Sequence, residues 1–440
     1  MKVHFIKKTN DSYVMFLCES LRFYNVNDAI KRLVEDILSG RPKNKSIEEF
    51  NISEADYDKI ARILDASPVH NFTAESEHTL YKLALNVTNT CNLNCKYCYA
   101  DGGNYSSLDG MMNIETARAA IDLFYSKYRS IRYIQFFGGE PLLNEPVIRF
   151  ACEYITNLYN TGKIDSLPEF GTISNGTVFS EKLAETIKKY NITITLSIDG
   201  PQVVHDSLRV YKNEIGSFSS LTENIKRYAT NSIAPVAAEA TYSSVHEENG
   251  LSVLDTVKYI KDELGIPNVH VVPVSGTEMY ELRNRDSFSD SVEDIFAELS
   301  TNKKDYSYSF VSRIVLSLKK RGANKYLCEA GISIFSVSHT GDIYPCFMLT
   351  GEQQFLMGNV YSGISVFEDQ RFLDLRNTLK AFSKYENEQC KDCFNNRICG
   401  GCLGMNYFNC GDIACTADKD CQMQKKLTEK VLLELSNQLK

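Results

Sequence analysis

The chain has 440 residues, which allows two to four domains at the usual size of roughly 100–200 residues each. Hydrophobic residues make up 43% and charged residues 24%, a globular balance that excludes disorder over most of the chain. The formal net charge of −8 argues against an electrostatic nucleic-acid binder. No signal peptide and no membrane-spanning apolar run are evident, so we expect a cytoplasmic protein without membrane association.

Residues 1–80 are predicted to form a small separate α+β unit. Strand-like runs cover 3–7, 13–17 and 21–24, and helical patterns cover 26–38, 47–50 and 54–64. The first helix ends at a Ser-Gly pair with a proline just beyond, which is a typical stop signal. Nothing in this unit resembles a catalytic motif.

Residues 81–320 alternate between strand-like and helical patterns. The expected strands cover 82–87, 133–137, 169–173, 192–198, 236–242 and 269–274. The expected helices cover 115–128, 145–159, 181–190, 219–228, 253–264 and 292–320, the last either continuous or broken near residue 302. Six such repeats predict an α/β fold with a parallel sheet and right-handed crossovers. Because a closed barrel needs eight repeats, we expect an open, partial (β/α)6 barrel.

Cysteine is abundant and unevenly distributed. The chain has 14 cysteines and no tryptophan, and three cysteines lie at 91–98 while nine lie at 328–421. In a long chain without an export signal, such clusters indicate metal ligation rather than a disulfide scaffold. Regular periodicity fades over 321–422, as expected where metal replaces an apolar core, and the tail at 423–440 is predicted to be an amphipathic helix. Cys18 and Cys152 fall in apolar patterns and are predicted to be buried thiols.

The first cysteine cluster is Cys91, Cys95 and Cys98, spaced C-x3-C-x2-C directly after the first predicted barrel strand. Three thiolates in one loop can hold three corners of a [4Fe–4S] cube and leave the fourth iron open. A zinc site, the alternative, would require a fourth protein ligand and usually uses C-x2-C pairs. The position at the carboxyl end of a parallel strand favours the iron–sulfur cluster, because α/β barrels carry out their chemistry there.

The motifs that follow this loop carry a resemblance. With Tyr97 before its last cysteine, the loop resembles that of the radical S-adenosylmethionine (SAM) superfamily, and the resemblance covers about residues 82–275. Further family-like motifs end the next three strands and come in the family's order, although each alone could be a simple turn. They are Gly138-Gly139-Glu140-Pro141, Ser174-Asn175-Gly176, and Ser197-Ile198-Asp199-Gly200-Pro201 followed by His205, Asp206 and Arg209.

The resemblance implies roles for individual residues in SAM binding. Gly138, Gly139 and Glu140 correspond to the segment that accepts hydrogen bonds from the amino group of the cofactor's methionine part. Ser197 and Arg209 would contact its ribose or carboxylate, and an arginine fork suits a carboxylate. Tyr97 and Asn175 are also expected to line the cofactor site.

The second cysteine cluster resembles the SPASM extension, which carries two auxiliary [4Fe–4S] clusters. The resemblance assigns a distal cluster to Cys390, Cys393, Cys399 and Cys421, and a near cluster to Cys328, Cys346 and Cys402. Cys399 and Cys402 are separated by two residues rather than the family's three. Gly322 stands where fully ligated relatives carry a further cysteine. The near cluster therefore either has an open iron or takes a fourth ligand from Cys410 or Cys415, and a pair of zinc ribbons is the alternative for the whole region.

Together these features resemble peptide maturases that install thioether cross-links in ribosomally made precursor peptides. The implied cofactors are SAM and three [4Fe–4S] clusters, and the implied partners are a precursor peptide with its leader and an electron donor such as flavodoxin or ferredoxin. The N-terminal unit is similar in architecture to winged-helix-like peptide-recognition units, which add a peptide strand to a sheet edge; its alternative is a structural cap. Competing functions are carbon–carbon cross-linking, formylglycine formation by an anaerobic sulfatase-maturating enzyme, and a zinc-stapled binding module without enzymatic activity.

Overall fold

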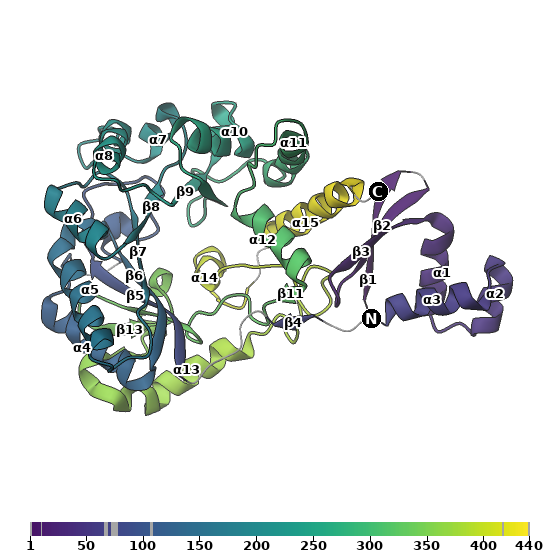
Figure 1. Ribbon diagram of the computed structural model, residues 1–440, viewed down its shortest axis with the longest axis horizontal. Helices are drawn as coiled ribbons and strands as arrows, with labels where there is room; N and C mark the ends of the chain where they lie inside the picture. Colours follow the sequence, from purple (N-terminus) through teal and green to yellow (C-terminus); the bar gives the residue numbers. More distant parts are fainter. Residues whose placement is uncertain are drawn as a thin grey trace.

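The computed structural model describes residues 2–9, 11–65, 69–71, 78–105, 109–415 and 418–438. Figure 1 shows a large α/β body at one end of the molecule and a small N-terminal unit at the other, with helix α15 (Asp418–Gln438) between them. Among the described residues, no helix combines the length and the apolar character needed to cross a membrane.

The N-terminal unit has the predicted three strands followed by three helices. An antiparallel sheet of order β1-β2-β3 packs with its helices around Met15, Leu17, Val34 and Leu64. The Asn27 side chain accepts a hydrogen bond from the Ile30 amide and so caps α1, the arrangement that favours asparagine at this position. The elements are β1 (Val3–Thr9), β2 (Ser12–Leu17), β3 (Arg22–Asn27), α1 (Asp28–Leu38), α2 (Lys43–Phe50) and α3 (Glu54–Leu64).

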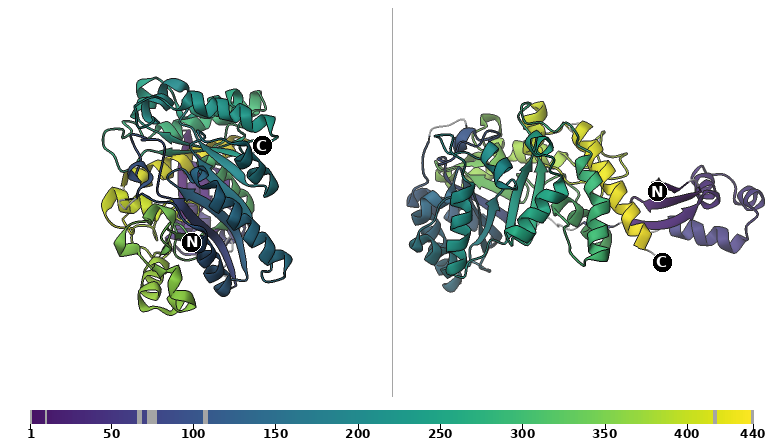
Figure 2. Two further views of the ribbon diagram at one scale, coloured as in Figure 1. Left: turned by 90° about the vertical axis from the view of Figure 1, so that its left-hand side faces the viewer. Right: turned by 90° about the horizontal axis from the view of Figure 1, so that it is seen from above.

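This unit is anchored to the C-terminal part of the chain, as Figures 1 and 2 show for β1–β3 and α15. The His4 ring stacks on Phe394 with ring centroids 3.8 Å apart, and its Nε2 lies 2.7 Å from Glu429 Oε1 on α15. The Asn25 side chain donates a hydrogen bond of 3.0 Å to the Ser436 carbonyl. The N-terminal unit therefore contacts both α15 and the loop that carries Cys393.

The α/β body is built on six parallel strands in the order β10-β9-β8-β7-β6-β5, which confirms the open, partial barrel. They are β5 (Thr79–Thr88), β6 (Ser130–Gly138), β7 (Glu169–Ser174), β8 (Thr193–Ser197), β9 (Ala237–Tyr242) and β10 (Asn268–Pro273). The helices that follow them are α4 (Ile114–Lys127), α5 (Glu145–Asn160), α6 (Glu181–Lys189), α7 (Gln202–Leu208), α8 (Phe218–Thr230), α9 (Ser244–Glu248), α10 (Val253–Lys258), α11 (Ser287–Thr301) and α12 (Ser309–Lys320).

Side chains alternate along these strands between an apolar core and the barrel interior. Leu83, Leu85 and Val87 of β5 are fully buried in the main apolar cluster with residues of the surrounding helices. The alternate positions point to the opposite face of the sheet, because successive strand residues face opposite ways. In β6 and β9 those positions include Gln135 and Glu239, so polar groups enter the barrel interior.

The C-terminal region extends the sheet, which the sequence pattern did not predict. Strand β12 (Ile334–Val337) pairs in parallel with β5, and β13 (Asp342–Tyr344) and β14 (Gly358–Asn359) follow as antiparallel strands. The run in β12 is only four residues long and its partner lies some 250 residues earlier, so no local signal marks it. A short parallel pair joins β4 (His70–Asn71) to β11 (Gly322–Ala323).

Two helix boundaries differ from the sequence pattern. The pattern over 292–320 is broken near residue 302, as one of its two alternatives allowed: α11 ends at Thr301, Lys303 adopts a positive φ of 58°, and α12 begins at Ser309; the start of α11 at Ser287 rather than at 292 is the difference. The C-terminal helix begins at Asp418 rather than at 423 and so includes Cys421; residues 439 and 440 lie outside the described residues. The remaining helices are α13 (Gln370–Ala381) and α14 (Leu403–Cys410).

Candidate active site

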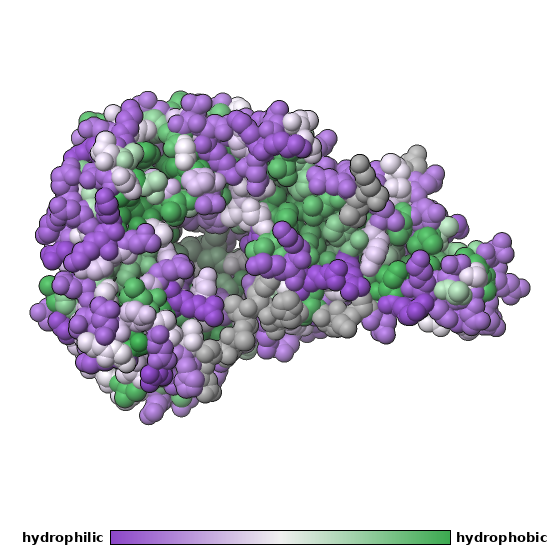
Figure 3. Space-filling model, viewed as in Figure 1, coloured by the Kyte–Doolittle hydropathy of each residue, from purple (hydrophilic) through white to green (hydrophobic). Residues whose placement is uncertain are grey.

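The first three predicted metal ligands lie at the carboxyl end of the parallel sheet. Cys91, Cys95 and Cys98 follow β5 and all three line one cavity of about 380 Å³. The Asn94 and Lys96 amides donate hydrogen bonds of 2.7 and 2.9 Å to the carbonyls of Val210 and Leu208, which hold the loop against the end of α7. Figure 3 shows an opening near the middle of the large body.

Gly138 and Gly139 are required where β6 approaches β5. Gly138 has a φ of +138°, and a Cβ on it would lie 2.0 Å from the Thr88 carbonyl oxygen. A Cβ on Gly139 would lie 2.5 Å from the Thr90 carbonyl oxygen. Because only glycine avoids both clashes, the cavity wall beside the cysteine loop is bare backbone, as the sequence motif predicts.

The Glu140 carboxylate, in contrast, connects two strand ends. It is fully buried and accepts hydrogen bonds from Ser174 Oγ at 2.9 Å, the Leu142 amide at 3.0 Å and the Asn175 amide at 2.7 Å. Burial raises the pKa of this carboxyl to about 7. Glu140 does not line the cavity, so its side chain positions the neighbouring residues, and a cofactor contact at this motif falls to the glycine backbone.

Asn175 lies beside the cysteine loop. Its Nδ2 donates a hydrogen bond of 2.9 Å to Asn92 Oδ1 and lies 3.8 Å from Cys91 Sγ. Its backbone amide is the one held by Glu140. Asn175 therefore contacts the first cysteine cluster directly, and its role in cofactor binding stays a prediction.

Tyr97, Asp199 and Arg209 form a hydrogen-bonded chain along the same cavity. Arg209 Nη1 donates to the Tyr97 hydroxyl at 2.5 Å, and that hydroxyl donates to Asp199 Oδ2 at 2.5 Å. Arg209 is only 9% exposed, yet its Nε has no hydrogen-bond partner among the described residues. The charge is paired, because Arg209 Nη1 lies 3.8 Å from Asp199 Oδ1, but the unsatisfied Nε leaves one buried donor that an acceptor such as a carboxylate would satisfy. Ser197 also lines the cavity.

The cysteines of the distal set gather around a second cavity of about 250 Å³, which is lined by Cys390, Cys393, Cys399 and Cys421. Cys402 of the near set lines both this cavity and the first one, and its Sγ lies 3.3 Å from Met348 Sδ. Burial raises the pKa of Cys328 to about 12 and that of Cys390 to about 11. Burial thus disfavours the thiolate form at both positions, and a bound metal would stabilise it.

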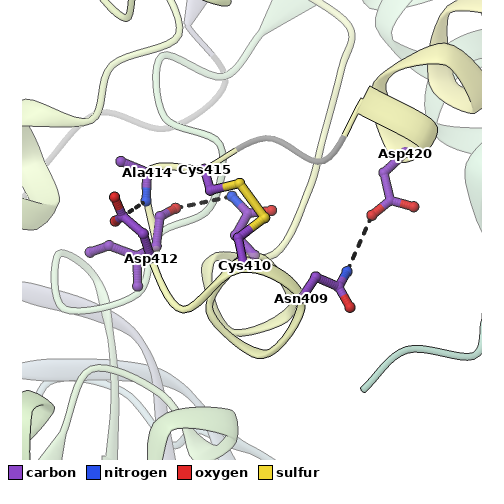
Figure 4. Close-up of a disulfide and its surroundings, with 8 residues drawn as sticks. Asn409, Cys410, Asp412, Ala414, Cys415 and Asp420 are labelled. Carbon is purple, nitrogen blue, oxygen red and sulfur yellow. Dashed lines mark hydrogen bonds between the residues drawn. A yellow bond between two sulfur atoms is a disulfide. The ribbon is translucent and has the colours of Figure 1, made fainter. Parts of the chain in front are cut away.

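Cys410 and Cys415 are joined to each other in a disulfide, which Figure 4 shows at the end of α14. The sequence left one of them as a possible fourth ligand of the near cluster. In this structure neither has a free thiol, and Gly322 is paired with His70 in the short β4–β11 ladder. The number of protein ligands at the near cluster stays a prediction.

Sequence reasoning missed three polar side chains in the barrel interior. Glu239 and His270, on β9 and β10, both line the first cavity, with Glu239 Oε1 3.9 Å from His270 Nε2. His270 Nδ1 contacts Ser309 Oγ. Gln135 is 4% exposed and its Oε1 has no partner in the described part of the chain. Their only sequence signal is one polar residue inside an otherwise apolar strand.

Comparison with known proteins identifies the family. Residues 85–271, which hold the cysteine loop, the glycine wall and the Tyr97–Asp199–Arg209 chain, match the family described as the radical SAM superfamily. Residues 85–271 are therefore a radical SAM domain. Residues 328–394 match SPASM, described as an iron-sulfur cluster-binding domain. The two domains imply a [4Fe–4S] cluster that binds SAM, together with auxiliary clusters, as predicted.

Related radical SAM proteins differ in what they do. The chain is 32% identical over 36% of its length to the radical SAM cyclopropyl synthase TigE of Paramaledivibacter caminithermalis, and it covers 36% of that protein. It is 32% identical over 32% of its length to a cysteine-type anaerobic sulfatase-maturating enzyme of Clostridium novyi, and it covers 38% of that protein. The chain spans 36–42% of the length of the first curated relatives that it matches.

Two solved structures share the fold of this radical SAM chain. Native anSMEcpe with bound AdoMet has a TM-score of 0.66 and 19% identity, over 82% of this chain and all of that one. Streptococcus suis SuiB bound to its precursor peptide SuiA has a TM-score of 0.55 and 14% identity, over 91% of this chain and 94% of that one. The likeness to SuiB extends over more of this chain than the likeness to anSMEcpe.

The residues present fit SAM and the iron–sulfur clusters, both in their charge and in the room that the two cavities provide. The first three cysteines and Cys402 border the first cavity, and Cys402 and the four distal cysteines border the second, whereas Cys328 and Cys346 line neither. Lys384 is 1% exposed and pairs with no carboxylate among the described residues, and burial lowers its pKa to about 8. An anionic cluster bound to the distal cysteines would supply the missing negative charge.

Proposed function

We propose that this chain is a peptide maturase that joins a cysteine sulfur of a ribosomally made precursor peptide to a carbon of the same peptide through a thioether. The observation that carries the proposal is the shared cavity. Cys402, which the resemblance assigns to the near cluster, lines the same cavity as Cys91, Cys95 and Cys98, as does its neighbour Met348; the other two assigned ligands, Cys328 and Cys346, do not line it. A substrate sulfur at the near cluster and a substrate carbon at the cofactor can therefore occupy one chamber.

When bound, SAM and its cluster supply the radical that removes a hydrogen atom from the substrate carbon. The chain's own residues hold the reactants in place. Arg209, with Tyr97 and Asp199 behind it, directs a charged donor into the cavity, and the bare backbone of Gly138 and Gly139 lets a ligand approach closely. The open position left by three near-cluster cysteines would receive the substrate thiolate, because thiolates are the usual ligands of these clusters.

Thioether formation also requires loss of the thiol proton. Glu239 and His270 line the chamber and lie 3.9 Å from each other, with Ser309 in contact with the far ring nitrogen of His270. We assign the Glu239 carboxylate as the proton acceptor for the substrate thiol. A positioned proton acceptor of this kind contributes about 10²–10⁴-fold to a rate.

The N-terminal unit supports a peptide substrate. Its outer strands, β1 and β3, pair with no further strand among the described residues, and an exposed sheet edge can accept a peptide as an added strand. The matched SuiB structure contains a precursor peptide. We assign leader binding to one of these two sheet edges, β1 or β3.

Binding of a thiol tests the proposed open position directly. A short synthetic cysteine peptide with blocked ends, added to the reconstituted chain, should change the electron paramagnetic resonance spectrum of the near cluster. The serine version of the same peptide should leave that spectrum unchanged, since a hydroxyl is a poor ligand for this cluster.

The disulfide provides the matched control for that experiment. Replacing Cys410 and Cys415 by alanine should leave both the near cluster and its response to the cysteine peptide intact. If this variant loses the near cluster, the protein itself supplies the fourth ligand and thiol capture is wrong.

Deleting residues 1–65 should weaken binding of the precursor peptide at least about tenfold, equivalent to about 1.4 kcal/mol, because the leader loses its sheet edge. Cleavage of SAM without peptide should persist, since the cofactor site lies in residues 85–271. Fluorescence anisotropy of a labelled precursor measures the affinity.

His4→Ala is the control for the deletion, because it weakens only the contact with Phe394 and Glu429. This variant should keep the affinity of the intact chain. Equal affinity in the intact and the deleted chain would show that the unit is a structural cap.

A further inference from the structure

Lys384 is a buried cation beside the distal cysteines. Its side chain is 1% exposed, and its Nζ donates a hydrogen bond of 2.6 Å to the Cys399 carbonyl. No carboxylate of the described residues lies within ion-pair distance of it, although buried lysines are normally paired. The lysine also lines the cavity that the four distal cysteines border.

Arg313 adds a second cation on the same cavity. It lies against Gly400, where an added Cβ would be 2.6 Å from Arg313 Nη1, so its guanidinium is next to the Cys399 segment. Its Nη2 donates a hydrogen bond of 2.9 Å to the neutral Gln424 amide oxygen, and its Nε is buried without a partner among the described residues. Like Lys384, it takes part in no ion pair in the described part of the chain.

The near cysteines have a different electrostatic surrounding. The lysine that interacts with Cys346 and Cys328 is Lys82 on β5, which is only partly buried and whose ammonium lies over the Phe347 ring at 5.8 Å. The Glu239 carboxylate also acts on Lys82 and offsets part of its charge. Positive charge is therefore concentrated on the distal side of the C-terminal region.

We propose that Lys384 and Arg313 raise the reduction potential of the distal cluster above that of the near cluster. The added electron increases the negative charge of a cluster, so uncompensated cations beside it favour the reduced form, and net charge and burial set such potentials. A cluster held by the distal cysteines would take up the one electron that the substrate loses when C–H and S–H are replaced by C–S. The hydrogen atom of the carbon goes to the radical, the thiol proton goes to Glu239, and the remaining electron would reduce the cluster while the substrate is oxidised. The effect on the potential does not depend on which bond the enzyme forms.

A potentiometric titration of the full, reconstituted chain, followed by electron paramagnetic resonance, tests the proposal without any peptide. The distal signal is the one that disappears when Cys390 and Cys421 are both replaced by alanine. In the natural chain it should have a higher midpoint potential than the near signal. Lys384→Met should shift the reduction equilibrium of the distal cluster at least tenfold toward the oxidised form, which is about 59 mV for one electron.

Two matched variants separate charge from structure. Lys384→Arg keeps the charge, so the midpoint potential of its distal cluster should stay close to that of the natural chain. Lys82→Met should leave the distal midpoint potential unchanged. An unshifted distal potential in Lys384→Met, or a distal potential below the near one in the natural chain, would overturn the proposal. If the Lys384→Met chain fails to assemble the distal cluster, the Arg313→Gln chain replaces it in the titration, because this change leaves the Lys384 hydrogen bond in place. An unshifted distal midpoint potential in Arg313→Gln would also overturn the proposal.

Discussion

Replacing Cys95 and Cys98 by alanine will abolish the formation of 5′-deoxyadenosine from SAM. Both cysteines border the cavity at the end of β5, and the first cluster cannot assemble on Cys91 alone. The auxiliary clusters use cysteines more than 200 residues further along the chain and should still form. Iron content should therefore fall from about 12 to about 8 atoms per chain, the loss of one cube of three. Chromatography of the nucleoside product and iron analysis measure the two effects.

Cys152→Ala is the matched control for this change. Cys152 is fully buried in α5 and outside both cavities, so its thiol has no ligand role. The control variant should keep its iron and its cleavage activity. Formation of 5′-deoxyadenosine by the Cys95→Ala, Cys98→Ala chain would place the radical site elsewhere.

Replacing Cys328 and Cys346 by alanine will abolish the cross-linked peptide while cleavage of SAM continues. The near cluster loses two of its three ligands, but the Cys91, Cys95 and Cys98 loop and the Arg209 chain are untouched. Abortive cleavage without product is the expected signature, because the substrate thiolate has no iron to bind. Product quantified by mass spectrometry, beside 5′-deoxyadenosine from the same reaction, separates the two steps.

The Cys410→Ala, Cys415→Ala chain is the comparison here, because it also removes two cysteines from the same region. It should make product at the rate of the natural chain. A normal yield of cross-linked peptide from the Cys328→Ala, Cys346→Ala variant would show that the near cluster takes no part in forming the bond.

The sequence predicted the part of the site that lies at strand ends. Asn175, Ser197 and Arg209 come close to the cysteine loop because parallel strands bring their carboxyl ends to one edge, so order along the chain was enough. The glycines were predicted as a place where a ligand approaches the backbone, whereas the structure shows a different requirement: β5 and β6 approach too closely for any Cβ. The role of the Glu140 carboxylate was not predicted. Only the folded chain shows that its oxygens accept hydrogen bonds from Ser174 and Asn175.

Features set by distant contacts gave no sequence signal. Lys384 stands among polar residues and looks like a surface lysine until the Cys399 segment covers it. Glu239 and His270 are single polar residues in short strands, and which face they occupy depends on strand register. Strand β12 depends on a partner in β5. The three cysteines of the near cluster and the four of the distal cluster are still assigned by resemblance, and these ligand sets stay predictions.

Mass spectrometry of the precursor peptide after reaction with the natural chain tests the central claim most directly. The peptide to use is the product of a short, cysteine-containing reading frame beside the gene, co-expressed with the chain under anaerobic conditions. We predict the loss of two hydrogen atoms for each cross-link, together with loss of alkylation at the linked cysteine and a fragment pattern that joins its sulfur to a carbon. Loss of two hydrogens with every cysteine still open to alkylation would indicate a carbon–carbon bond, and conversion of a cysteine to formylglycine would indicate a sulfatase-maturating activity; either result would contradict the thioether account.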